Sequence, residues 1–195
     1  MDRFDRLGRI LASAAAGLLL ATLSAAAHAG FVGITLNAYY AYNTIDTPYA
    51  FATATPSTFT VADAGIDTTV DVEGVTTIAV DFSDNSVRIV FNTNLTLPTW
   101  NVAPFNGLVF DAVAPSLIDF TTATIDPTTT MAGFDSARVV LEAGRLGFNW
   151  NGLSYVDGTV LKVNFGDPRQ LPEPGTLALV GALLGLLALG ARRRA

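Results

Sequence analysis

The sequence predicts an all-β domain, an antiparallel β-sandwich of jelly-roll type, between two apolar terminal segments that we expect to be helical. Residues 30–170 show no sustained 3.6-residue periodicity. They contain short runs rich in Val, Ile, Thr, Phe and Tyr that end at Gly, Pro, Asn or Asp, as antiparallel strands do. Residues 1–29 and 171–195, by contrast, carry long uncharged runs bordered by arginines. A closed barrel is the alternative architecture for the middle segment.

The N-terminal segment has the three parts of a secretory signal peptide. Its first nine residues contain three arginines, and residues 10–27 form an uncharged run rich in Ala and Leu. Ala27 and Ala29 then place small side chains at the two positions that signal peptidase must accommodate. We therefore expect a signal helix (1–29) that directs export by Sec-type machinery and is cleaved after Ala29, with an uncleaved signal anchor as the alternative.

Two β-hairpins are the clearest elements of the middle segment. In the first, residues 76–82 and 86–91 alternate in hydrophobicity around Asp84 and Asn85, whose side chains tolerate the left-handed backbone of a tight turn. In the second, Ala143–Gly144 joins residues 138–142 to residues 145–150. Further strands are expected at residues 31–42, 58–61, 68–72, 108–113, 117–124 and 158–165, with prolines between the runs.

Composition restricts the chemistry available to residues 30–170. The chain has no cysteine, and its single histidine, His28, would leave with the signal peptide. These absences exclude thiolate nucleophiles, histidine-dependent triads and Cys- or His-ligated metals. The only lysine, Lys162, lies in a strand-like run, which does not favour a Ser–Lys pair. We expect no catalytic residues, no cofactor and no enzyme, with a carboxylate-based glycoside hydrolase as the enzymatic alternative.

Charge and acidic clusters add two further expectations. Residues 30–170 carry fourteen acidic and five basic side chains, and this acidic balance argues against nucleic acid as a partner. Two acidic groups could supply part of a Ca²⁺ shell, but neither has EF-hand spacing, and residues four apart converge only in a helix. We interpret them as solvated strand edges and turn caps and expect no metal site; they are Asp63, Asp67, Asp71 and Glu73, and the run from Asp81 to Asn85.

Aromatic residues offer one candidate binding surface. Exposed flat rings on a secreted sandwich could stack on sugars through their apolar faces and polar edges, although most such rings fill cores. Alternation points Trp150 inward, whereas Trp100 lies near Pro98 in an expected loop and is the best candidate for an exposed ring and a possible sugar contact, although core packing is the favoured interpretation of these residues. The full set is Tyr39, Tyr40, Tyr42, Tyr49, Trp100, Trp150 and Tyr155.

The C-terminal segment, residues 171–195, joins a short motif, an apolar run and a basic end. The motif is Pro172-Glu173-Pro174, residues 177–191 are uncharged, and the cluster at the end is Arg192, Arg193 and Arg194. From Gly175 to Ala191 a helix would span roughly 25 Å, which is marginal for a bilayer core. We expect a transmembrane helix with its arginines as a cytoplasmic stop and with Glu173 held in extended backbone outside, where a protease can bind it.

This segment resembles the PEP-CTERM sorting signal of Gram-negative bacteria. In that family the signal is processed by exosortase, an integral-membrane enzyme with a catalytic cysteine, and its carriers are typically exported proteins associated with exopolysaccharide or biofilm production. The resemblance covers only residues 171–195 and implies a route rather than an activity. It implies an exported protein that is held transiently in the inner membrane and then passes to the cell envelope or extracellular matrix, and the residue types missing from residues 30–170 lead us to expect that this protein is non-enzymatic. A plain tail anchor and a secreted carbohydrate-binding module, with a polysaccharide as partner, are the alternatives.

Overall fold

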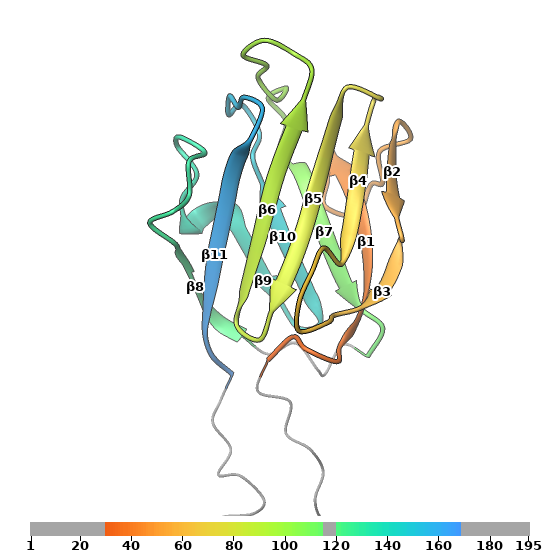
Figure 1. Ribbon diagram of the computed structural model, residues 1–195, viewed down its shortest axis with the longest axis vertical. Coiled ribbons are helices and arrows are strands. Elements are labelled where there is room, and N and C mark those ends of the chain that lie inside the picture. Colours follow the sequence, from red (N-terminus) through yellow and green to blue (C-terminus); the bar gives the residue numbers. More distant parts are fainter. Residues whose placement is uncertain (1–29, 115–119, 169–195) are drawn as a thin grey trace, which may run out of the picture. The chain divides into compact units, whose positions relative to one another are not determined.

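The computed structural model describes residues 30–114 and 120–168, which form two antiparallel β-sheets packed face to face (Figure 1). This confirms the predicted all-β sandwich. No ladder joins the two sheets within this part of the chain, so the barrel alternative is wrong. The predicted signal peptide with Ala27 and Ala29, and the predicted C-terminal motif, helix and arginine cluster, lie outside the described residues.

One sheet has five strands and the other has six. The first has the order β3–β1–β7–β10–β9, and the second has the order β2–β4–β5–β6–β11–β8. The strands of the first sheet are β1 (Thr35–Tyr42), β3 (Thr58–Thr60), β7 (Asn106–Ala112), β9 (Val139–Glu142) and β10 (Arg145–Asn149). Those of the second are β2 (Ala52–Thr55), β4 (Thr68–Val72), β5 (Thr76–Ser83), β6 (Ser86–Thr93), β8 (Phe120–Ile125) and β11 (Thr159–Pro168).

Both predicted hairpins are confirmed. Ser83 pairs with Ser86, which leaves Asp84 and Asn85 as a two-residue turn, and Arg145 pairs with Glu142 around Ala143–Gly144. The turn geometry of the first hairpin differs from the expectation, because neither Asp84 nor Asn85 takes a positive φ. In the second hairpin Gly144 supplies the left-handed residue, with a φ of 76°.

Strand ends differ from the predicted ranges at several places. β1 begins at Thr35 rather than Phe31, because residues 31–34 form a turn closed by the bond from the Ile34 amide to the Phe31 carbonyl (2.9 Å). β2 was not predicted, since Ala-Thr-Ala-Thr lacks a strong hydrophobic alternation. Arg138 belongs to a short 3-10 helix, η2 (Ser136–Arg138), rather than to β9.

The inner faces of the sheets meet in an aromatic and aliphatic core. Phe82 of β5 lies edge-on to Phe110 of β7 with ring centroids 5.0 Å apart, which joins the two sheets directly. Phe31 is 0% exposed and packs between Phe120 (4.5 Å) and Phe165 (5.2 Å). The start of the described chain is therefore part of the core.

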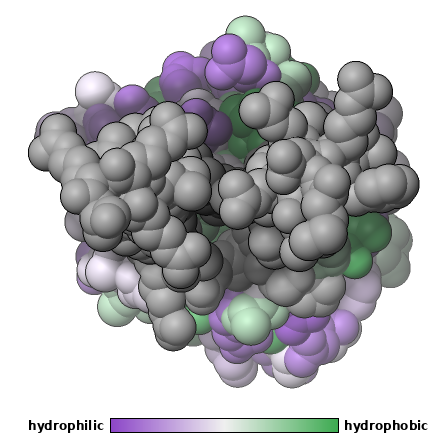
Figure 2. Space-filling view, turned by 90° about the horizontal axis from the view of Figure 1, so that it is seen from below, coloured by the Kyte–Doolittle hydropathy of each residue, from purple (hydrophilic) through white to green (hydrophobic). Residues whose placement is uncertain are grey.

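Residues 30 and 168 leave the sandwich at the same end. The Phe31 amide donates to the Asp84 carbonyl (2.8 Å) and the Phe165 amide donates to the Asn85 carbonyl (2.7 Å), so both segments meet the β5–β6 turn. This is the lower end in Figure 1, and Figure 2, which views it from below, shows hydrophilic and hydrophobic residues mixed around its rim. No helix in residues 30–114 and 120–168 is long and apolar enough to cross a membrane.

Candidate functional site

A cavity of about 410 Å³ lies at the opposite end of the sandwich, where the loops gather in the upper part of Figure 1. Its walls come from β1, the β4–β5 turn, the long β6–β7 loop and the β10–β11 loop. The aromatic residues that line it are Tyr40, Tyr42, Tyr49, Trp100 and Tyr155. We call this cavity the aromatic pocket.

Two loops that are far apart in the sequence build one wall of the aromatic pocket. The Trp100 amide donates to the Leu153 carbonyl (2.9 Å), and the Tyr155 amide donates to the Pro98 carbonyl (3.0 Å). These bonds fix the β6–β7 loop against the β10–β11 loop. As a result the rings of Trp100 and Tyr155 stack with centroids 4.7 Å apart and planes 9° from parallel.

Trp100, the best candidate for an exposed ring, instead packs in the core cluster, which agrees with the favoured interpretation of these aromatic residues. Its side chain is 9% exposed, because the bonded loops hold it over the open end of the core. Its indole N–H is buried and has no hydrogen-bond partner among the described residues. Trp100 nevertheless lines the aromatic pocket, so it contributes part of a ring face rather than a free surface.

A buried hydrogen-bond network supports the floor of the aromatic pocket. The Tyr40 hydroxyl donates to Asn106 Oδ1 (2.6 Å) and accepts from Trp150 Nε1 (2.9 Å). Asn106 in turn donates through Nδ2 to the Asn101 carbonyl (2.8 Å). Burial raises the pKa of Tyr40 well above its ordinary value. Because the Tyr40 hydroxyl, Trp150 Nε1 and the Asn106 amide all have hydrogen-bond partners, this network holds the floor of the aromatic pocket in one arrangement.

Tyr49 and Glu73 form the most polar part of the wall. The Tyr49 hydroxyl donates to Glu73 Oε1, and this bond is the main reason why the pKa of Tyr49 is raised to about 12. Glu73 lies in the β4–β5 turn at a φ of 58°, and its amide donates to the Phe51 carbonyl (2.8 Å). Among the lining residues of the aromatic pocket, Glu73 is the only charged one.

A second, shallower hollow of about 520 Å³ adjoins the aromatic pocket and shares Tyr49 and Glu73 with it. Phe51 lines this hollow with its side chain 70% exposed, and its ring lies 5.7 Å from the ring of Tyr49 in an edge-on arrangement. We call it the Phe51 hollow. Sequence reasoning did not single out Phe51, whose exposure no local pattern indicates.

The remaining predicted aromatic candidates lie elsewhere. Trp150 is 0% exposed and serves the core and the Tyr40 network, as its alternation predicted. Tyr39 belongs to β1 and donates its hydroxyl to the Ile45 carbonyl (3.1 Å), and it is not part of the lining of the aromatic pocket. Thus the structure gathers five of the seven predicted aromatics at one site.

Two of the acidic residues considered as Ca²⁺ ligands, Asp67 and Asp71, accept hydrogen bonds from backbone amides. Asp67 accepts from the backbone amides of Ala62 (3.0 Å) and Phe82 (2.8 Å), and Asp71 accepts from the amide of Gly74 (2.9 Å). In residues 30–114 and 120–168 no three acidic or histidine side chains come together in a group that could hold a metal ion.

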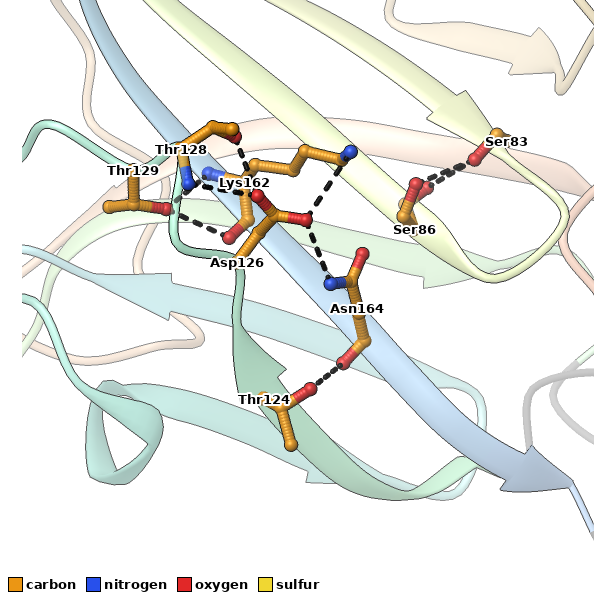
Figure 3. Close-up of polar contacts among 8 residues, drawn as sticks. All are labelled: Ser83, Ser86, Thr124, Asp126, Thr128, Thr129, Lys162 and Asn164. Carbon is orange, nitrogen blue, oxygen red and sulfur yellow. Dashed lines mark hydrogen bonds and ion pairs between the residues drawn. The ribbon is translucent and has the colours of Figure 1, made fainter.

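Lys162 takes part in a structural cluster that ties the loop after β8 to β11 (Figure 3). Asp126 accepts from the Thr128 hydroxyl (2.6 Å), from Asn164 Nδ2 (3.0 Å) and from Lys162 Nζ (3.4 Å). The nearby Ser83 and Ser86 hydroxyls bond to each other (2.6 Å), and Figure 3 draws no contact from either to Lys162. The arrangement fastens the loop and leaves no serine activated by lysine among the residues drawn.

Comparison of the chain with protein-family models, with curated proteins and with solved structures finds no match. Proposals about function therefore rest on the sequence and on the geometry of the aromatic pocket.

Proposed function

We propose that the protein is an exported, non-enzymatic component of the cell envelope or extracellular matrix, sorted by an exosortase-type membrane protease. The observation that carries the proposal is the order of Pro172-Glu173-Pro174, an apolar run and three arginines at the end of a chain that begins with signal-peptide features. The precursor would be exported by Sec-type machinery and held in the inner membrane until cleavage near Glu173. By its resemblance, the protein would be associated with exopolysaccharide or biofilm.

The position of Phe31 supports the expected signal-peptide boundary. Cleavage after Ala29 would leave Gly30 as the first residue and would keep Phe31, whose ring fills the core between Phe120 and Phe165. Cleavage a few residues later would remove a fully buried aromatic side chain, at a cost of about 3–5 kcal/mol. The fold therefore uses the chain from the residue that follows the expected cut onward.

The arrangement of the ends supports a tether at residues 169–195. β5 runs for eight residues from Thr76 at the aromatic pocket to Ser83 at the β5–β6 turn, where β11 leaves the sandwich. At about 3.3 Å per residue, the aromatic pocket lies about 25 Å from the exit of the chain. A tether attached there would leave the aromatic pocket accessible.

The carboxylates at the two cavities support a non-enzymatic role. In the part of the chain that the structure describes, Glu73 is the only carboxylate that lines the aromatic pocket or the Phe51 hollow. A glycoside hydrolase of the usual kind needs two carboxylates on either side of the scissile bond, so Glu73 alone does not supply its acid and its nucleophile or base.

The test is mass spectrometry of the protein made in its native host and in the same host lacking exosortase. We expect the mature chain to begin at Gly30 and to lack Arg192–Arg194 in the native host, and to retain these arginines without exosortase. Glu173→Ala should also block C-terminal processing, whereas Glu142→Ala, a change of the same kind in the β9–β10 hairpin, should leave it intact. Equal processing in both hosts, or an intact chain lodged in the native membrane, would overturn the proposal.

A further inference from the structure

We infer that the aromatic pocket and the Phe51 hollow together bind a neutral oligosaccharide, with one sugar ring in the pocket and the next ring against Phe51. This inference does not depend on the sorting proposal, because it concerns the folded sandwich alone. It rests on three features of this end of the molecule: its ring surfaces, its uncharged polar groups and its distribution of charge.

Ring surfaces line both hollows. Tyr42, Tyr49 and Trp100 border the aromatic pocket, and Phe51 continues the same surface outside it, edge-on to Tyr49. The faces of sugar rings carry C–H groups that pack on aromatic faces, and ligand pockets typically combine such surfaces with a few polar groups.

Uncharged polar groups stand between the rings. Thr76, Thr99, Asn101 and Asn106 all line the aromatic pocket. The Tyr42 hydroxyl and the Asn101 amide make no side-chain hydrogen bond within the described part of the chain, so both are available to a ligand. Sugar hydroxyls, each of which can donate and accept, match such a mixture of hydroxyl and amide groups.

The charge of the site selects against anionic sugars. Within residues 30–114 and 120–168, no lysine or arginine lines either hollow, and Glu73 is shared by both. A uronate or sulfate group would face this carboxylate with no cation to balance it, which is unfavourable even near a solvated surface. A neutral chain avoids this repulsion and can donate hydroxyl hydrogens to the Glu73 oxygens.

The shape distinguishes a sugar chain from a compact cation. A cage of rings beside a carboxylate could also hold a quaternary ammonium group through cation–π attraction. Such a ligand would occupy one cage of rings, whereas here two hollows of about 410 and 520 Å³ lie side by side with Tyr49 between them. The polar residues that line the pocket would also lack partners on a methylated ammonium group.

The site is preformed, which lowers the cost of binding. The β6–β7 and β10–β11 loops are bonded to each other through Trp100 and Tyr155, and the Tyr40 network fixes the floor. Because Trp100 is one of only two tryptophans in the chain and lines the aromatic pocket, its fluorescence offers a direct readout of occupancy.

The experiment uses the full-length protein, purified in a detergent that has no sugar headgroup. It is titrated by calorimetry and tryptophan fluorescence with neutral gluco-, manno- and galacto-oligosaccharides of one to six rings, with oligouronates and with choline. We expect at least one neutral series to bind, with affinity that rises from one ring to two. If none of the neutral sugars binds, or if only oligouronates or choline bind, the inference is wrong.

Three variants locate the binding. Phe51→Ala should weaken binding of chains of two or more rings about tenfold and leave a single ring unaffected, while Tyr42→Ala should weaken both by a similar factor. Ile66→Ala removes another exposed apolar side chain, 63% exposed and outside both hollows, and should change nothing. Equal affinities for Phe51→Ala, Ile66→Ala and the unmodified protein would overturn the two-ring assignment.

Discussion

Between the two hollows, the Tyr49 hydroxyl donates a hydrogen bond to the Glu73 carboxylate, and the backbone of Glu73 is held at a φ of 58°. A non-glycine residue in this left-handed region costs about 1 kcal/mol, and Gly74 beside it has a φ of 67° at no such cost. The β4–β5 turn thus carries backbone strain at the residue that presents the only carboxylate of both hollows.

Relieving this strain should stabilise the fold. Asparagine tolerates left-handed backbone, so Glu73→Asn should raise the free energy of unfolding by about 0.5 kcal/mol, the net of relieved strain and one lost exposed hydrogen bond. In a Tyr49→Phe background, where that bond is already absent, the gain should reach about 1 kcal/mol. Urea denaturation of the unmodified protein, the two single variants and the double variant measures both changes in unfolding free energy. If Glu73→Asn lowers stability in the Tyr49→Phe background, the assignment of strain to Glu73 is wrong.

The same pair predicts an alkaline dependence. The hydrogen bond to Glu73 raises the pKa of Tyr49 from 10.0 to about 12. Because the folded value lies above the unfolded one, the pair contributes stability in full below pH 10 and loses it as pH rises through about 12. Glu73→Gln should bring the pKa of Tyr49 back toward 10.0, seen as earlier phenolate absorbance on titration, whereas Glu142→Gln should not. Superimposable titration curves for the two variants would contradict this.

Removal of the Tyr40 hydroxyl should be costly because two buried groups depend on it. Tyr40→Phe leaves Trp150 Nε1 and Asn106 Oδ1 without the bonds of 2.9 and 2.6 Å that they now make. We expect a loss of about 2 kcal/mol of unfolding free energy. Tyr39→Phe, the same change at the neighbouring residue, removes one bond to a carbonyl at a half-buried position and should cost about 0.5 kcal/mol. Similar losses for both variants would show that the network adds nothing.

Asp126 should make stability depend on acid. Hydrogen bonds hold the pKa of Asp126 well below its ordinary value of 3.8, and the bond from the Thr128 hydroxyl contributes most, followed by the bond from the Asn164 amide. A lowered folded pKa contributes stability above pH 3.8 that disappears as pH falls through the folded value. Melting temperatures from pH 7 to pH 2 should therefore show Asp126→Asn well below the unmodified protein at neutral pH, with the gap closing in acid. Asp63→Asn is the matched control and should follow the unmodified protein throughout.

The parts of the fold that sequence reasoning predicted are those in which local signals agree. Residues 76–83 and 86–93 alternate in hydrophobicity and enclose a short polar turn, so their pairing could be read directly. β2 could not be predicted, because Ala-Thr-Ala-Thr owes its strand to pairing with β4 rather than to any pattern of its own. The turn at residues 31–34 likewise depends on contacts with the β5–β6 turn and with Phe120.

The candidate site was only partly predictable, for the same reason. Aromatic residues were recognised one by one, but alternation does not reveal that Tyr42, Trp100 and Tyr155 come from three separate loops or strand ends to one pocket. Its place in a loop made Trp100 the best candidate for an exposed ring, but this loop is bonded to a second loop more than fifty residues away, and the ring is held in the core. Glu73 was considered as an acidic ligand, whereas its turn conformation and its bond to Tyr49 are features of the folded chain.

The end of β11 and the aromatic pocket lie at opposite ends of the sandwich, and this arrangement has a mechanical consequence. A sandwich held by the end of β11 and pulled by a ligand in the aromatic pocket would carry tension along its strands. β11 lies between β6 and β8, and its ladder bonds are perpendicular to that tension. Extraction of β11 would then require many bonds to shear together instead of opening singly from an edge. Along this direction the load would be shared by the ladders that β11 forms with β6 and with β8.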